Sequence, residues 1–215
     1  MSETKRPALT RDRLLQAAVE LADRGGLESV SMRRLAAALG VEAMSLYHHV
    51  AGKDDLLGGM LDVVVGEMEV ASPDLGWKEA LRRSAISAHD VLVRHRWAAG
   101  LMMTAGVGAA RLRFMEGLLA TLRRSGFPAD LTHHAYHALD SHIVGFTLWQ
   151  VSLPPSEELT GLAADFLRQL DVESYPYFAE HVEQHLGDSA ASGAEEFAFG
   201  LDLLLDGLER LRDEG

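Results

Sequence analysis

The chain has 215 residues, of which 47% are hydrophobic and none is cysteine, and its formal net charge is −12. This length allows one sizeable core or two smaller ones, and the lack of cysteine excludes a disulfide framework and a thiolate metal site. The first residues lack the apolar run of a signal peptide, and the longest uncharged stretches are too short for a membrane span, so we expect a cytoplasmic protein with no membrane partner.

The charge is divided unevenly along the chain. Residues 1–53 carry eight Lys and Arg against six Asp and Glu, a net of +2, whereas residues 54–215 carry 12 against 26, a net of −14. Such an asymmetry is typical of a nucleic-acid-binding segment on an otherwise acidic protein. We therefore predict a DNA-binding head over 1–53 and a larger body over 54–215.

The first predicted helix begins after an N-cap at Thr10 and runs to about Arg24. Its apolar residues recur at helical spacing, and Gly25 and Gly26 stop it. We expect this helix to pack on the next two and complete a three-helix head.

Residues 31–53 predict two short helices joined by a tight turn, with Ser31 as the N-cap of the first helix. Apolar residues between Met32 and Leu39 form one stripe, and Val41, Leu46 and Val50 form a second, shorter one. Gly40 supplies the turn, because a residue without Cβ takes a positive φ at no steric cost. This pattern is that of a helix-turn-helix, whose second helix fits the major groove of DNA. The alternative is an ordinary helix pair, since many all-helical proteins join two helices at a glycine.

The predicted DNA contacts form two groups. Residues at helix N-termini, or near the end of the second helix, are placed to contact phosphates, and residues on its outward face are placed to reach base edges. The phosphate group is Ser31, Arg33, Tyr47, His49 and Lys53. The base group is Ala43, Met44, Ser45 and His48.

Residues 9–57 resemble the TetR family of bacterial transcription regulators. The shared features are a first helix ending in a glycine pair, the run S-M-R-R-L-A, the G-V turn, and S-L-Y-x-H-V followed by K-x-x-L-L. The resemblance implies an all-α fold, with a helix-turn-helix head and a larger helical domain for effector binding and dimerisation. It also implies a homodimeric repressor that a small-molecule effector releases from double-stranded operator DNA.

Every element predicted after residue 53 is helical. One helix opens at Asp54 and Asp55 and continues to about Val70, and in the family it links the head to the body. The stretch 96–108 is too interrupted by glycine for a long helix, and 187–194 is a loop. Further helices are predicted near 77–92, 112–122, 135–149, 159–170, 176–186 and 197–211.

Two of these helices carry a narrow apolar seam with alternating spacings of four and three residues, as in coiled coils. The family dimerises through its eighth helix and its last, so two such helices per subunit would form a four-helix interface. The alternative is that both seams face the core of a single chain. The predicted interface residues are Leu139, His142, Phe146, Leu201, Leu204 and Leu208.

A weaker resemblance to the C-terminal domain of the tetracycline repressors covers most of the remaining chain. Positions that contact the magnesium–tetracycline chelate there carry Met68, Met102 and Trp149 here. A thioether and an indole do not bind Mg²⁺, which prefers oxygen, so we expect neither tetracycline, nor a metal, nor another cofactor. We predict instead a small apolar effector, although the same residues could simply be core. The predicted wall is Met68, Met102, Met115, Leu118, Tyr136 and Trp149, with Ser84 and Asp140 as polar anchors.

His133 and His137 lie four residues apart, with Asp140 three further on, which is the spacing of a Zn²⁺ site on one helical face. We favour the alternative, polar residues of a pocket or an interface. No catalytic motif is present, so we predict that the protein is not an enzyme. Two rival functions stay open: a small-molecule-binding protein whose head has lost DNA binding, and a helical enzyme that uses the body pocket.

Overall fold

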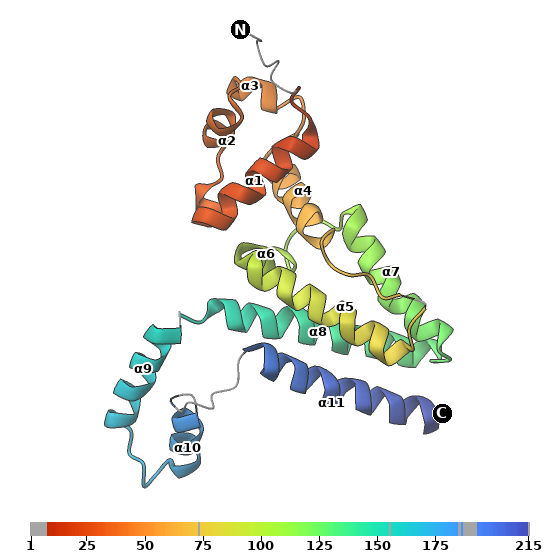
Figure 1. The fold of residues 1–215 in the computed structure, drawn as a ribbon, viewed down its shortest axis with the longest axis vertical. Coiled ribbons are helices and arrows are strands. Elements are labelled where there is room, and N and C mark those ends of the chain that lie inside the picture. Colours follow the sequence, from red (N-terminus) through yellow and green to blue (C-terminus); the bar gives the residue numbers. More distant parts are fainter. Residues whose placement is uncertain (1–7, 73, 155, 185, 187–192, 215) are drawn as a thin grey trace.

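The structure is a computed structural model that describes residues 8–72, 74–154, 156–184, 186 and 193–214. These residues form helices and contain no strand, which confirms the predicted all-α class. A head at one end is joined by a single helix to a larger body, and two further helices extend from the side of the body (Figure 1). In the described part of the chain, no helix is long and apolar enough to cross a membrane.

The head contains α1 Arg11–Gly25, the 3₁₀ helix η1 Leu27–Ser29, α2 Met32–Leu39 and α3 Ala43–Leu46. The side chain of Thr10 caps α1 by accepting the Arg13 N–H (3.2 Å), and that of Ser31 caps α2 by accepting the Arg34 N–H (3.3 Å). Gly40 ends α2 at φ 67°, in the left-handed region that glycine adopts without strain. The predicted caps and the turn are therefore confirmed.

Helix α4, Lys53–Val65, connects the head to the body. It packs on α1 and on helices of the body, so it belongs to both parts. The sequence predicted this helix to about Val70, which is wrong by about one turn. Gly66 closes it, the N–H groups of Glu67 and Met68 then bond to carbonyls three residues back, and the chain turns away. This turn buries the Met68 side chain in the core.

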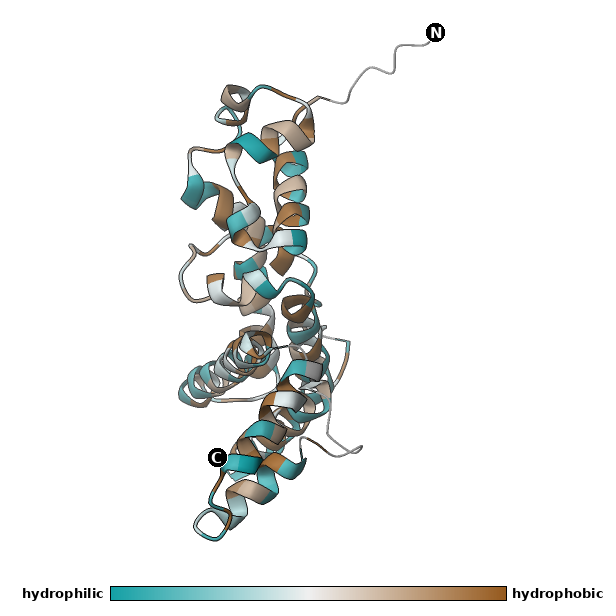
Figure 2. Ribbon diagram, turned by 90° about the vertical axis from the view of Figure 1, so that its left-hand side faces the viewer, coloured by the Kyte–Doolittle hydropathy of each residue, from teal (hydrophilic) through white to brown (hydrophobic). Residues whose placement is uncertain are grey.

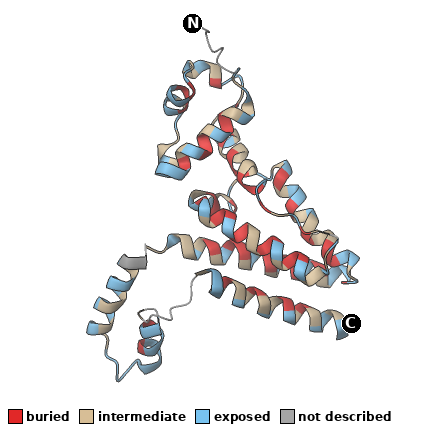
Figure 3. Ribbon diagram, in the orientation of Figure 1, coloured by how far each residue is buried: buried red, intermediate tan, exposed pale blue. Residues whose placement is uncertain are grey.

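The body is built on α5 and α8, which pack on each other, with α11 along both and α6 and α7 around them. Figure 3 shows buried residues along the facing sides of these helices. The interrupted stretch after α5 contains only one short helix, as predicted. The bounds are α5 Trp77–Arg94, α6 Arg96–Leu101, α7 Ala109–Arg124, α8 Ala129–Ser152 and α11 Gly193–Glu214.

Helices α9 Ser156–Gln169 and α10 Pro176–Gln184 pack on each other and extend from the body as an arm (Figure 1). Pro176 opens α10, as predicted, since its fixed φ suits the first turn of a helix. The loop predicted over 187–194 lies mostly outside the described residues.

Polar and apolar residues share most helices of the molecule (Figure 2). Their apolar sides meet in one continuous cluster, which runs from Leu14 in the head through Met60 and Val64 of α4 to Leu205 at the far end of the body. The head therefore shares its core with the body through α4. A movement of α4 changes the packing of both.

Candidate nucleic-acid interface and effector site

The four residues predicted to reach base edges lie on α3 or directly after it. Met44 is 73% exposed and His48 is also exposed, whereas Ala43 and Ser45 are half-buried. The Ser45 hydroxyl donates to the Glu42 carbonyl (2.6 Å), so towards another molecule its oxygen acts as an acceptor. An apolar side chain held out in water, as Met44 is, can contact the methyl group of thymine.

The five residues predicted to contact phosphates lie at the ends of α2, α3 and α4. Ser31 and Arg33 at the start of α2 and Lys53 at the start of α4 are exposed, Tyr47 is 50% exposed, and His49 is half-buried. The Ser31 oxygen accepts a backbone N–H as the cap of α2, which leaves the hydroxyl proton able to bond to a phosphate. All five are therefore accessible at the edges of the helix-turn-helix.

The guanidinium of Arg11 in α1 holds the turn between α3 and α4. It donates to both carboxylate oxygens of Asp55 (2.6 and 3.0 Å) and to the His49 carbonyl (2.6 Å). The same carboxylate accepts the Ala51 N–H (2.8 Å). The bonds from Arg11, followed by the bond from Ala51, lower the pKa of Asp55 to about 2.

This support for the helix-turn-helix was missed in the sequence. Arg11 and Asp55 lie 44 positions apart, and no helical spacing links them. Its place in the sequence shows only that Asp55 lies at the start of a helix, where a negative charge is favourable. The pair fixes the backbone around His49, next to the predicted DNA contacts.

Asp62 in α4 fixes the other end of this helix to the body. Its Oδ1 accepts the N–H groups of Ala110 (2.8 Å) and Arg111 (3.2 Å) in the first turn of α7, which otherwise has no side-chain cap. A Cβ added at Gly108 would collide with the same carboxylate. A glycine at this position therefore lets α7 dock onto α4.

Five residues of the predicted effector wall belong to the apolar core that runs through the whole molecule. Met68, Met102, Leu118 and Tyr136 are buried in this core, and the partly buried Met115 packs against it. This is also what the alternative, that these residues are simply core, predicts. Burial also raises the pKa of the Tyr136 hydroxyl.

The predicted polar anchors differ in what they can offer. Ser84 is fully buried, and its hydroxyl donates to the Glu69 carbonyl (2.7 Å). Asp140 is half-buried, and burial raises the pKa of its carboxyl, while Arg111 and His137 act in the opposite direction. Asp140 is therefore better placed than Ser84 to bond to a ligand.

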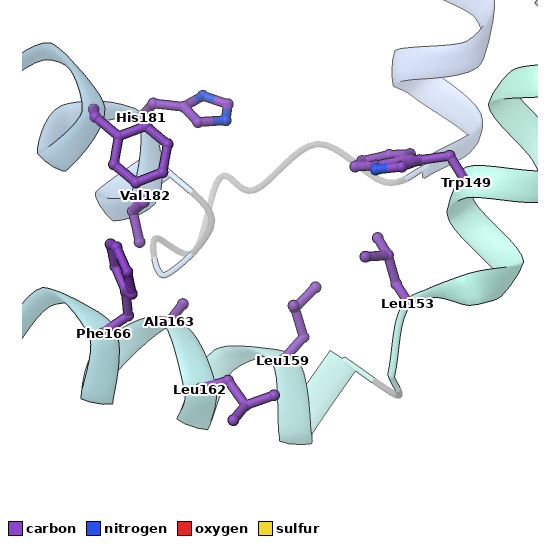
Figure 4. A pocket seen from close by; sticks show the side chains of 9 residues that line it. Trp149, Leu153, Leu159, Leu162, Ala163, Phe166, His181 and Val182 are labelled. Atoms are coloured by element: carbon purple, nitrogen blue, oxygen red, sulfur yellow. The ribbon is translucent and has the colours of Figure 1, made fainter.

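Trp149 lies apart from the other predicted wall residues, at the end of α8. It is 51% exposed and faces an apolar cavity of about 480 Å³ between α8 and the arm (Figure 4). This volume falls in the usual range of small-molecule pockets. Of the residues that line this cavity, the sequence had predicted only Trp149 as an effector contact. The lining residues are Trp149, Leu153, Leu159, Leu162, Ala163, Phe166, Phe178, His181 and Val182.

The predicted interface residues divide into two sets. Leu139, Leu201 and Leu208 are 1%, 0% and 7% exposed, so their side chains pack inside the chain and a partner would meet neighbouring residues instead. The half-buried residues of the seams are His142, Phe146 and Leu204.

Three large apolar side chains on α11 stand in solvent. Phe199, Leu203 and Leu211 are 68%, 58% and 53% exposed. Exposing apolar surface to water is unfavourable. Phe199 and Leu203 were missed because they lie outside the narrow seam of alternating spacings, whereas Leu211 is the last residue of that seam.

His133 and His137 are both exposed on α8, with ring centroids 4.6 Å apart. Among the residues that the structure describes, no group of three or more His, Asp or Glu is placed to hold a metal ion.

Comparison with known protein families gives two matches that together span nearly the whole chain. Residues 14–60 match the model of bacterial regulatory proteins of the tetR family, and residues 71–212 match that of the tetracyclin repressor-like C-terminal domain. The first covers the helix-turn-helix, and the second covers most of the body with the arm.

Individual proteins show the same similarity. The chain is 36% identical to the HTH-type transcriptional repressor DrrR1 of Streptomyces coeruleorubidus, over 98% of this chain and 81% of that protein. Two solved Streptomyces coelicolor structures are also similar. The regulator SCO7222 has a TM-score of 0.80 and 27% identity, over 95% of this chain and 100% of that one. ActR in complex with actinorhodin has a TM-score of 0.77 and 28% identity, over 95% and 98%.

Proposed function

This chain belongs to the TetR family of bacterial transcriptional regulators, and we propose that it is a homodimeric repressor that a small apolar molecule releases from a palindromic operator. The main support for DNA binding is the group of solvent-accessible side chains on and around α3. Met44 and His48 stand out from the helix that would enter the major groove, and Arg33 and Lys53 flank it as cations.

The charge distribution supports the same orientation on DNA. The head has a net charge of +2 and the rest of the chain −14, so the body is repelled by the phosphate backbone and the head faces it. Such a regulator works where the bacterial chromosome is, so we infer a cytoplasmic location. We assign it binding only and no catalytic step.

The DNA contacts are tested with a duplex that the full-length protein selects from a random pool. Lys53→Ala should weaken binding to all sequences alike and reduce the slope of log affinity against log salt by about one, because one phosphate contact is lost. Arg124→Ala removes the same charge from an exposed position at the end of α7 and should leave the slope unchanged. A Lys53→Ala protein with altered sequence preference and an unchanged slope would refute the phosphate assignment.

We further propose that the effector is apolar and binds the methionine-rich set around Met102. Methionine side chains adapt to varied apolar shapes, and the similar ActR has been solved with actinorhodin bound. The wall comprises Met68, Met102, Met115 and Leu118, with Tyr136 and Asp140 as polar groups. An effector can shift the equilibrium between two conformations by no more than the difference between its binding free energies for them.

Thermal-shift screening of small molecules, with and without EDTA, tests both parts of this proposal. Stabilisation by a hit should survive EDTA, because the proposed site uses no metal. Because Met102 is buried, Met102→Arg is compared only after circular dichroism shows that it is folded. It should then abolish the shift and operator release while leaving operator binding intact. Leu162→Arg, which changes the cavity beside Trp149, is the matched variant. If only Leu162→Arg blocked the hit, the effector site would lie in that cavity and our residue assignment would be wrong.

A further inference from the structure

A carboxylate at the end of α1 ties the head directly to the body. Asp23 Oδ1 accepts a hydrogen bond from Trp97 Nε1 (2.7 Å) and lies 2.8 Å from His95 Nδ1, which donates to it. Trp97 is in α6, and His95 is the residue between α5 and α6. Figure 1 shows the end of α1 beside α6, well away from the point where α1 meets α4.

The same histidine also faces the segment that follows α4. Its Nε2 lies 3.4 Å from Glu67 Oε2, and Arg94 donates to that oxygen at 3.0 Å. His95 itself is only 8% exposed. The five residues Asp23, Glu67, Arg94, His95 and Trp97, here called the junction cluster, therefore join the head, the end of α4 and the start of α6.

The position of Asp23 is unfavourable for α1 considered alone. It lies in the last turn of the helix, where the macrodipole favours cations over anions. A residue that opposes local preference points to a role elsewhere in the molecule. In this structure the donors that offset its charge come from the body.

Two attachments constrain the head more than one does. The first runs along α4, from Asp55, which pairs with Arg11 of the head, to Asp62 at α7, so both of its ends lie on the axis of that helix. Contacts on one axis oppose rotation about it only weakly. The second, at Asp23, lies off that axis and opposes this rotation. The angle of each head then sets the distance between the two reading helices of a dimer.

We propose that Asp23, His95 and Trp97 determine which half-site spacing the dimer accepts. The inference rests on the proposed function, since a dimeric helix-turn-helix binds half-sites one helical turn apart, about 34–36 Å. None of the three residues is among the predicted DNA contacts. They act as positioning residues, through the orientation of the head.

The test uses the full-length protein and a duplex that it selects from a random pool. In derived duplexes, the two half-sites are moved together or apart by one and two base pairs. Asp23→Ala removes the acceptor, and Trp97→Phe removes the indole N–H while keeping an aromatic ring. Glu20→Gln is the control, because the ion pair of Glu20 is with Arg24, within α1 itself (3.0 Å). Circular dichroism and sedimentation establish that each variant is a folded dimer.

Wild type and Glu20→Gln should lose the same affinity on each change of spacing. In Asp23→Ala and Trp97→Phe, the factor by which each change of spacing lowers the affinity should be smaller than in the wild type by about threefold or more. An effect of this size is expected from the interaction energy between contacting residues. Spacing profiles that match the wild type, or a loss of affinity that is equal at every spacing, would overturn the proposal. If the wild type selected no duplex, the proposed function itself would fail, and the spacing role with it.

Discussion

At the scale of single residues, His89 shows how a buried polar group joins three helices. Its ring stacks on Phe197 of α11, with centroids 4.1 Å apart, and its Nδ1 lies 2.8 Å from Thr147 Oγ1 of α8. The Thr147 hydroxyl donates its own proton to the Ile143 carbonyl (2.6 Å), so the Nδ1–H of His89 must be the donor. His142 stacks on Phe197 as well, with centroids 4.7 Å apart, so two imidazoles contact one phenyl ring.

The first prediction concerns pH. Burial lowers the pKa of His89, with a further lowering by His142 and an opposing effect of Asp90. As the pH falls through about 6.5, the unfolded chain takes up this proton before the folded one, so the free energy of unfolding falls, by at most about 1.4 kcal/mol per pH unit. His89→Phe should flatten this dependence between pH 7.5 and 5 in urea titrations.

His134→Phe supplies the matched control for this measurement, since His134 is exposed on α8. It should leave the pH dependence as in the wild type. A His89→Phe protein with the wild-type slope would show that other groups cause the dependence.

At the scale of elements, α4 is the piece that both parts of the molecule share. Arg11 holds its first turn through Asp55, and its own Asp62 caps α7. The side chain at one position thus satisfies backbone N–H groups of another helix that is far away in sequence. Displacing α4 would therefore require the start of α7 to move or to lose its cap.

The second prediction tests this cap with a single methyl group. Gly108→Ala should lower the free energy of unfolding by about 1 kcal/mol, the usual effect of losing a helix cap, because the added Cβ collides with Asp62. Gly106→Ala is the control, since a Cβ there meets no atom within 4 Å. Urea midpoints compare the two, and equal midpoints would mean that Asp62 and α7 adjust without loss.

At the scale of the whole molecule, the exposed side of α11 is an apolar surface that the described residues of the single chain leave uncovered. Leu203 lies on the opposite side of that helix from the buried Leu201 and Leu205. A second copy that covers Leu203 and its exposed neighbours would remove apolar area from water, which favours association. We therefore expect the dimer interface to include the exposed face of α11 around Leu203, in addition to the seam predicted from the sequence.

The third prediction follows for the dimer. Leu203→Glu should yield monomers in sedimentation experiments, because a carboxylate without a partner is costly to bury in an interface. Operator affinity should fall with it, since one head reads one half-site. Leu112→Glu, at a similarly exposed leucine of α7, should remain dimeric. A Leu203→Glu protein that stayed dimeric would place the interface elsewhere.

The sequence by itself determined the family and the local structure. The cap at Ser31, the turn at Gly40 and the helical stripes depend on residues within a few positions of one another, so spacing is enough to predict them. The motif over 9–57 contains these features together, and the family predicted from it is confirmed. The alternating seams correctly predicted helices near 135–149 and 197–211, which lie within α8 and α11.

Only the tertiary structure decided which side chains meet across the molecule. Asp23 and Trp97 are 74 positions apart, and their hydrogen bond depends on how α1 packs against α6. The seams likewise did not show that Leu201 faces the core while Leu203 faces solvent. The physical reason is that local backbone geometry repeats with a fixed period, whereas the partner of each helical face is set by the packing of all the helices together.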